Sequence, residues 1–142
     1  MELTSCSLTV AECVPIAAGL RRPGLLSLNV SNNPKLGDAG VAALADVLPP
    51  TLTDLKIYKT SCGEAGMAAI SHRIATTLPH LERLYCSDNG AIGLDGWTQL
   101  GVALAALPNL VELRANRCAM GSATALALVL PRAAAACRRS DS

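Results

Sequence analysis

Short alternating apolar runs recur along this chain, and each is followed by a longer stretch with helical spacing. Four runs have the form Leu-x-x-Leu-x-apolar or small, and they begin at Leu25, Leu52, Leu81 and Leu110, which are 27, 29 and 29 residues apart. Alternation with period two is typical of a short, half-buried strand. A fixed period of this length indicates a stack of repeated supersecondary units. The sequence therefore predicts one strand at the start of each repeat.

A helix is predicted in the second part of each repeat. Three copies hold glycine in one column, at Gly40, Gly66 and Gly96, with apolar residues four and eight positions later. That spacing forms the buried stripe of a helix. Glycine costs about 1 kcal/mol relative to alanine in a helix, so its recurrence indicates close packing against a neighbour. Asp38 and Asp95 precede the helical stretches and are predicted to cap them.

The repeats are predicted to form one domain, residues 1–142. They are a partial repeat at 1–24, full repeats at 25–51, 52–80, 81–109 and 110–132, and a tail at 133–142. Pro15 falls inside the first predicted helix and is expected to kink or shorten it. Neither end shows a polar terminal cap, which a stack of repeats needs. We expect either part of a longer protein or a chain whose ends are covered by partners.

Composition and charge exclude several classes of protein. The net charge is +1, which gives no case for a nucleic-acid partner. No apolar run reaches the ~18 residues of a membrane-spanning helix, so no membrane insertion is expected. The first residues do not have the pattern of a signal peptide. A cytoplasmic location is predicted, with nuclear and cytoskeletal locations left open.

Candidate catalytic and metal-binding residues are few. The six cysteines fall mostly at apolar repeat positions and are predicted to be reduced, buried thiols. No C-x-x-C pair and no phosphate-binding glycine loop occurs. His72 is predicted to face solvent, and His80 lies in a predicted turn. Trp97 is predicted to pack between helices, with an exposed contact as the alternative. The sequence predicts no enzyme, no metal and no cofactor.

The strand motif, the period and the glycine-containing helices resemble those of leucine-rich repeats. The segments LGDAGVAALADVL and IGLDGWTQLGVAL are similar to the ribonuclease-inhibitor-like subclass. The resemblance covers about residues 3–132. It implies an α/β leucine-rich-repeat solenoid, a horseshoe segment with parallel strands on the concave face and helices on the convex face. Two loops, after Asn33 and Asn89, are one residue longer than usual, and Thr60 replaces the asparagine of the second copy.

The strand side chains that point away from the core form the predicted binding surface. Columns such as Asn29-Lys56-Tyr85-Arg114 would cross adjacent strands, so that their side chains act together. Tyrosine and arginine are frequent in interface hot spots. A plain solvated sheet face is the competing interpretation. The predicted protein-binding residues are Asn29, Asp54, Lys56, Tyr58, Lys59, Glu82, Arg83, Tyr85, Asp88, Glu112, Arg114 and Arg117.

Three functions remain open from the sequence. The first is a non-enzymatic protein–protein interaction module that binds a partner protein on the concave strand face, as the resemblance implies. The second is a structural subunit of a large multiprotein assembly, which contacts its neighbours through uncapped ends and convex helices. The third is a GTPase-regulatory protein of the same fold, for which no distinctive arginine or asparagine constellation is present.

Overall fold

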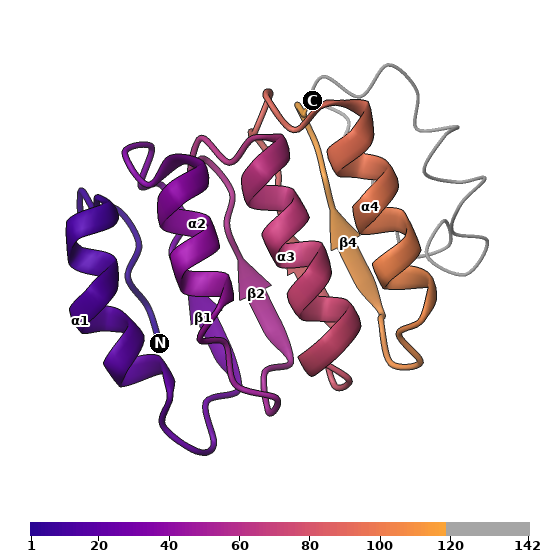
Figure 1. The fold of residues 1–142 in the computed structure, drawn as a ribbon, viewed down its shortest axis with the longest axis horizontal. Helices are drawn as coiled ribbons and strands as arrows, with labels where there is room; N and C mark the ends of the chain where they lie inside the picture. Colours follow the sequence, from indigo (N-terminus) through magenta and orange to yellow (C-terminus); the bar gives the residue numbers. More distant parts are fainter. Residues whose placement is uncertain (119–142) are drawn as a thin grey trace.

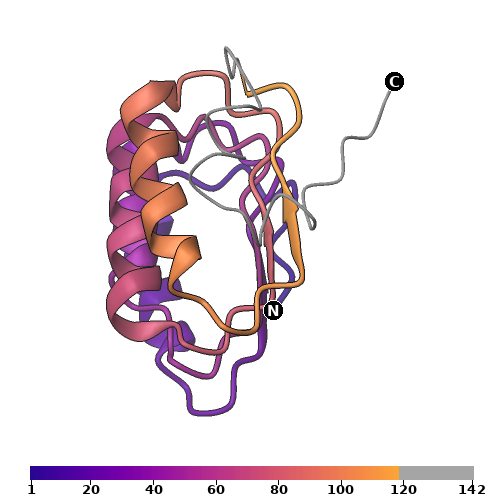
Figure 2. The ribbon, with the colours of Figure 1, turned by 90° about the vertical axis from the view of Figure 1, so that its right-hand side faces the viewer.

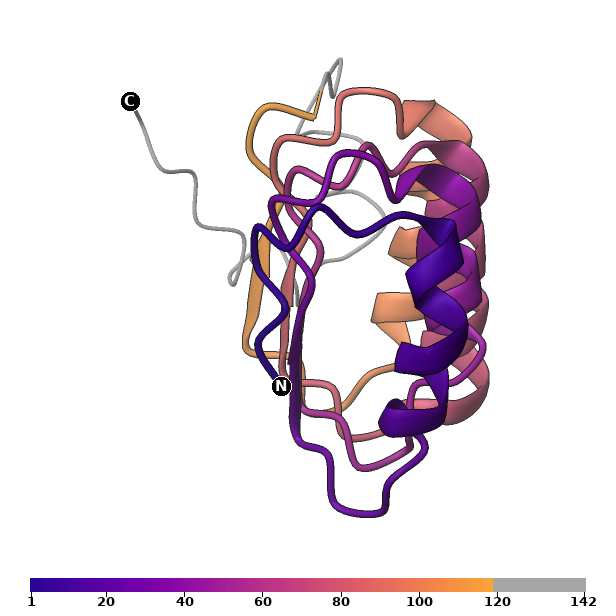
Figure 3. The ribbon, with the colours of Figure 1, turned by 90° about the vertical axis from the view of Figure 1, so that its left-hand side faces the viewer.

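In the computed structural model the chain folds into two layers, a parallel sheet and a row of helices (Figure 1). The structure describes residues 1–118. The strands are β1 (Ser27–Asn29), β2 (Asp54–Lys56), β3 (Arg83–Tyr85) and β4 (Glu112–Arg114), and the helices are α1 (Val10–Leu20), α2 (Gly37–Ala45), α3 (Glu64–Thr77) and α4 (Gly93–Ala105). In the two side views all of these helices lie on one side of the sheet (Figures 2 and 3). The α/β class is confirmed.

Adjacent strands pair in parallel and in the order of the chain, β1-β2-β3-β4. The central leucines of the four strands, Leu28, Leu55, Leu84 and Leu113, stand in one register row. The predicted strand positions are therefore confirmed, with only three residues of each run in regular strand. The predicted helix of repeat 110–132 and the tail 133–142 extend beyond the described residues.

The hydrophobic core lies between the sheet and the helices. The central strand leucines point into it, and the helices contribute the predicted stripe, represented by Leu44, Ile70 and Leu100. Trp97 is also buried, as its first interpretation predicted. Fully burying a leucine or isoleucine side chain contributes about 1.5–3 kcal/mol. Each helix buries its apolar stripe against its own strand and against neighbouring repeats. The stability of both layers therefore depends on the stacking of the repeats.

Buried asparagines join neighbouring repeats. The Asn89 Oδ1 accepts hydrogen bonds from the backbone N–H groups of Thr60 and Cys62, both at 3.1 Å. Its Nδ2 donates to the Ile57 carbonyl oxygen at 2.9 Å. Asn33 makes the corresponding bonds to the N-terminal repeat. Thr60 occupies this column in repeat 52–80, and its hydroxyl donates to the Ile57 carbonyl oxygen of its own repeat. The junction between repeats 25–51 and 52–80 therefore lacks an asparagine side chain that bonds across it.

Asp38 caps a different helix from the one predicted. The N-cap of α2 is Leu36, so Asp38 lies inside the first turn of its own helix. Its Oδ1 accepts from the backbone N–H groups of Gly63 at 2.7 Å and Gly66 at 2.8 Å, at the start of α3. Asp95 likewise lies inside the first turn of α4, whose N-cap makes no side-chain bond. The predicted caps were wrong because both helices begin before the aspartate.

The glycine column has two physical causes. A Cβ at Gly66 would lie 2.8 Å from an oxygen of Asp38, on the neighbouring helix. A Cβ at Gly96 would meet Ile92 of its own repeat at 2.9 Å, with the backbone of α3 at 3.5 Å. A Cβ at Gly40 would meet Leu36 of its own repeat at 2.8 Å. Packing on the neighbouring helix therefore explains Gly66 best.

Pro15 does not end α1, in contrast to the expected shortening. The helix runs through it for 11 residues, from Val10 to Leu20. A capping box holds its first turn, in which the Thr9 hydroxyl accepts from the Ala11 N–H at 3.3 Å and the Thr9 N–H donates to Glu12 at 2.7 Å.

Candidate protein-binding surface

The sheet face is the side of the sheet away from the helices, and it carries most of the predicted binding residues. Each strand places a residue on either side of its buried leucine. Parallel pairing aligns Lys56 with Tyr85 and Tyr85 with Arg114. It also aligns Asp54 with Arg83. The structure thus brings together side chains from strands that are 29 residues apart in sequence.

Tyr85 lies at the centre of this face. The Lys56 Nζ is 5.4 Å from the centroid of its ring, and the Arg114 Cζ is 5.0 Å from it. Both distances are within the range of cation–π attraction. The Tyr85 hydroxyl donates to the Glu112 Oε2 at 2.8 Å, and the Arg114 Nε donates to the Glu112 Oε1 at 2.6 Å. The Tyr85 ring is therefore fixed by the hydrogen bond of its hydroxyl to Glu112, and it lies next to two cations.

The pKa shifts in this cluster keep the Tyr85 phenol neutral and the Arg114 guanidinium charged. Burial raises the pKa of Tyr85, and its hydrogen bond to Glu112 adds to the rise. The hydrogen bond to Glu112 raises the pKa of Arg114. At neutral pH Tyr85 consequently stays a hydrogen-bond donor, and Arg114 stays a cation.

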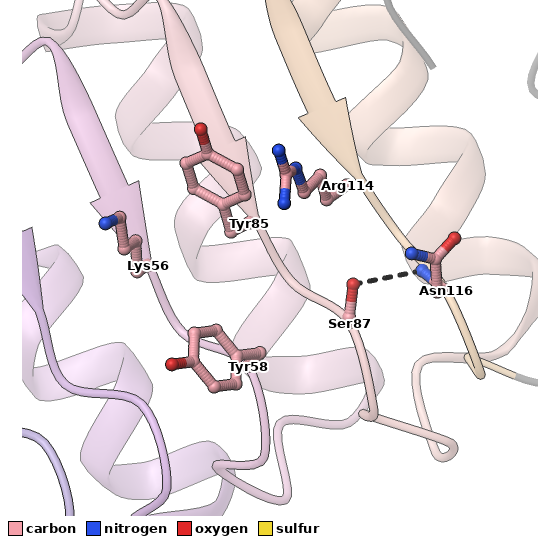
Figure 4. A pocket seen from close by; sticks show the side chains of 6 residues that line it. All are labelled: Lys56, Tyr58, Tyr85, Ser87, Arg114 and Asn116. Atoms are coloured by element: carbon pink, nitrogen blue, oxygen red, sulfur yellow. Dashed lines mark hydrogen bonds between the residues drawn. The ribbon is translucent and has the colours of Figure 1, made fainter. Parts of the chain in front are cut away.

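An open hollow of about 500 Å³ lies beside Tyr85. It is lined by Lys56, Tyr58, Tyr85, Ser87, Arg114 and Asn116 (Figure 4). The Ser87 hydroxyl accepts from the Asn116 backbone N–H at 3.1 Å and so ties the two adjacent repeats at its rim. Ser87 and Asn116 were not among the predicted binding residues, although they share a repeat column with Tyr58.

The other charged residues on the sheet face pair mainly with each other. Arg83 lies 3.1 Å from Asp54 and 3.8 Å from Glu82. The hydrogen bond to Asp54 raises the pKa of Arg83. Arg117 lies 3.7 Å from Asp88. Exposed pairs of this kind contribute little to stability. They fit the competing interpretation of a solvated face better than the cluster around Tyr85 does.

Asn29 is covered, although the alternation placed it on the binding surface. It is 6% exposed, and its Nδ2 donates to the Glu2 Oε2 at 2.7 Å. The N-terminal residues run beside β1, where the Leu3 N–H donates to the Asn29 carbonyl oxygen at 2.8 Å. Alternation predicts only the side of the sheet on which a residue lies, and another segment covers this one.

Three of the predicted residues lie in left-handed turns after the strands. Lys59, Asp88 and Arg117 have φ angles of 52°, 56° and 53°. Ser5 and Asn32 share this column with φ angles of 55° and 57°. Such angles are unusual for residues other than glycine, asparagine and aspartate. The sequence did not reveal this turn, because lysine and arginine give no local signal for it.

The thiols and possible metal ligands give no site within residues 1–118. In that range no group of three or more His, Cys, Asp and Glu side chains is placed to hold a metal ion. Cys13, Cys62, Cys86 and Cys118 are buried, whereas Cys6 is exposed, contrary to the prediction. Burial raises the pKa of Cys62 to about 12, so its thiol stays protonated at neutral pH. Across the same residues no helix is both long and apolar enough to cross a bilayer.

Comparison with known proteins found solved structures of similar fold. No protein-family model and no curated protein matches the sequence. The structure is similar to one described as leiomodin-1 actin-binding site 2 (ABS2), with a TM-score of 0.68 and 17% identity over 83% of this chain and 70% of that chain. It is also similar to the tropomodulin C-terminal domain of Caenorhabditis elegans, with a TM-score of 0.52 and 12% identity over 88% of this chain and 93% of that chain.

These structures correct the family expected from the repeat pattern. The similar folds are those of leiomodin and tropomodulin domains, so the assignment to the ribonuclease-inhibitor-like subclass was wrong. The alternating leucines and the period describe a strand–turn–helix unit, which says which residues are buried and does not say to which family the unit belongs. At 17% and 12% identity the similarity concerns the fold alone. The chain has the fold of these two domains.

Proposed function

We propose that this chain is a non-enzymatic protein-binding module whose partner lies on the sheet face. The observation that carries the proposal is the hollow beside Tyr85, where two tyrosines lie next to Lys56 and Arg114. Aromatic residues and arginine dominate interface hot spots, because they bury large area and still form polar contacts. Tyr85 is already held by Glu112 and two cations, so little side-chain entropy is lost when a partner binds.

Actin is the first candidate partner. The leiomodin-1 structure of similar fold is described as an actin-binding site, and its TM-score is 0.68. Binding to actin would place the chain in the cytoplasm, at the cytoskeleton. The proposed binding surface consists of the binding residues predicted from the sequence except Asn29. Asn29 is left out because Glu2 covers it.

The repetition of strand, turn and helix supports a finer description of the shape. In it, residues 1–142 form one domain, a segment of a repeat solenoid, and the sheet face is its concave side. Register rows of one residue per repeat support this arrangement. A partner on such a face contacts several repeats at once.

The test measures binding of the purified chain to actin. Co-sedimentation with filaments and fluorescence titration with monomers give the affinity of the native chain and of the Tyr85→Ala and Tyr58→Ala variants. We expect Tyr85→Ala to weaken binding about tenfold or more, which is a hot-spot effect. His72→Ala is the control, since His72 is exposed on α3, away from the sheet face. Equal binding by all four proteins would contradict the sheet face as the site.

The helix layer offers a second candidate function, contact within a larger assembly. Val14 on α1 is 75% exposed, and Leu94 and Val102 on α4 are 69% and 65% exposed. Exposed apolar side chains on helices are contacts that an assembly would bury. Leu94→Ser should then reduce association with neighbours and leave actin binding intact. Among residues 1–118 no constellation favours the GTPase-regulatory alternative.

A further inference from the structure

The hollow on the sheet face has an excess of positive charge, because only one of its two cations, Arg114, is paired with an acidic residue among residues 1–118. Two cations, Lys56 and Arg114, line it, and none of the lining residues that the structure describes is acidic. In the described part of the chain Lys56 forms no ion pair. Its contact is the ring of Tyr85, with 5.4 Å from Nζ to the centroid. Lys56 therefore keeps its three N–H donors available for an anion.

Arg114 also has donors left for a ligand. Its Nε donates to Glu112, and its side chain is 53% exposed. A guanidinium has five N–H donors, so its terminal groups can still bind a carboxylate. Glu112 accepts both this bond and a hydrogen bond from the Tyr85 hydroxyl. The cluster of Lys56, Arg114 and Glu112 has a net charge of +1.

The spacing of the two cations suits an extended chain. Lys56, Tyr85 and Arg114 occupy consecutive strands in register. Strands lie about 4.8 Å apart, so residues two strands apart are separated by about 10 Å. In an extended segment, side chains two positions apart lie on the same side at a spacing of about 7 Å. Two glutamates in such positions reach both cations, because their flexible side chains spread apart by the few ångströms that separate the two spacings.

We propose that this hollow recognises an acidic, extended segment of the partner protein. The segment crosses β2, β3 and β4, with one carboxylate at Lys56 and another at Arg114 on either side of the Tyr85 ring (Figure 4). Tyr58 flanks the intervening residue. The inference rests on the proposed function and adds the chemistry of the partner. Charge complementarity selects this occupant, because a basic or neutral segment would leave Lys56 without a counter-ion.

A peptide titration tests the inference directly. The probe is a fluorescein-labelled octapeptide of alternating glutamate and serine, compared with the same peptide carrying glutamine at every glutamate. Fluorescence anisotropy is measured with the full chain at 50 mM and 200 mM salt. We expect the glutamate peptide to bind at least tenfold more tightly than the glutamine peptide, and its binding to weaken as salt rises. Equal affinity of the two peptides would overturn the inference.

Matched lysine variants locate the site. Lys56→Gln removes a cation that lines the hollow, and Lys35→Gln makes the same charge change at an exposed lysine in the loop before α2. We expect Lys56→Gln to weaken binding of the glutamate peptide about fivefold or more, and Lys35→Gln to change it less than twofold. Equal effects of the two variants would show a general charge attraction and refute a site at the hollow.

The same variants separate this inference from the proposed function. If Tyr85→Ala abolishes binding to actin while Lys56→Gln leaves it unchanged and the two peptides bind alike, the sheet face is the binding site and the acidic segment is refuted. If the glutamate peptide binds in a Lys56-dependent way while actin does not bind, actin is refuted as the partner and the acidic specificity stands. Circular dichroism of each variant establishes that it is folded.

Discussion

Replacing Asp38 by alanine tests how strongly neighbouring repeats are joined. The carboxylate accepts two backbone hydrogen bonds at the start of α3, at 2.7 and 2.8 Å. Hydrogen bonds to a charged group contribute about 1.5–3 kcal/mol, and loss of a helix cap costs about 0.5–2 kcal/mol. Asp38 is only half-buried, so water replaces part of the loss. We expect Asp38→Ala to lower the free energy of unfolding by about 2 kcal/mol.

Urea denaturation followed by circular dichroism measures this change, and thermal melting gives a second value. For a chain of this size 1 kcal/mol corresponds to roughly 4 °C, so the melting temperature should fall by about 8 °C. Asp95→Ala is the matched control. Asp95 also lies in the first turn of a helix and is exposed, so its loss removes only about 0.3–1 kcal/mol of helix-dipole stabilisation. Equal destabilisation by the two variants would refute the role of Asp38 as a cap between repeats.

Three further predictions concern packing, the asparagine junction and the thiols. Gly66→Ala should destabilise by about 1–2 kcal/mol, because the new Cβ would lie 2.8 Å from the carboxylate of the neighbouring helix. Gly19→Ala should instead stabilise by up to about 1 kcal/mol, since its Cβ would meet nothing closer than 3.8 Å; equal urea midpoints for the two variants would contradict the packing argument. Asn89→Ala should cost about 2–4 kcal/mol in urea unfolding, because buried backbone groups of two repeats lose their partner, and a loss below 1 kcal/mol would refute the junction. Iodoacetamide at pH 8 should label exposed Cys6 and leave Cys62 unlabelled in the native chain, because a pKa of about 12 leaves almost no thiolate at that pH; mass spectrometry showing equal labelling would contradict the burial of Cys62.

The repeat pattern predicted the strands and the core correctly, because the buried positions recur with the period of the repeat. Leu28, Leu55, Leu84 and Leu113 each stand at the middle of an alternating run, and the structure aligns them in one register row. The helix stripe followed from spacing in the same way. These features depend on residues a few positions apart, and side-chain periodicity within a strand or helix is a local property.

The pattern was less informative where one repeat meets the next. It placed Asp38 as a cap for its own helix, whereas the carboxylate bonds to α3, 25 and 28 residues later. It placed Asn29 on the open surface, where Glu2 covers it. The left-handed turn at Lys59, Asp88 and Arg117 also went unseen, because lysine and arginine do not mark such turns and aspartate stands in this column in one of the three copies.

The candidate site shows the same division. Sequence alone established that Lys56, Tyr85 and Arg114 share a repeat column on the outer side of the sheet, because the alternation and the period fix both the face and the row. Only the tertiary structure decided that Arg114 and Tyr85 both bond to Glu112 while Lys56 is left without an ion pair among the described residues. The physical reason is that each partner is reached by side-chain conformation across a strand pair, and no periodicity along one chain specifies which neighbouring charge a side chain will choose.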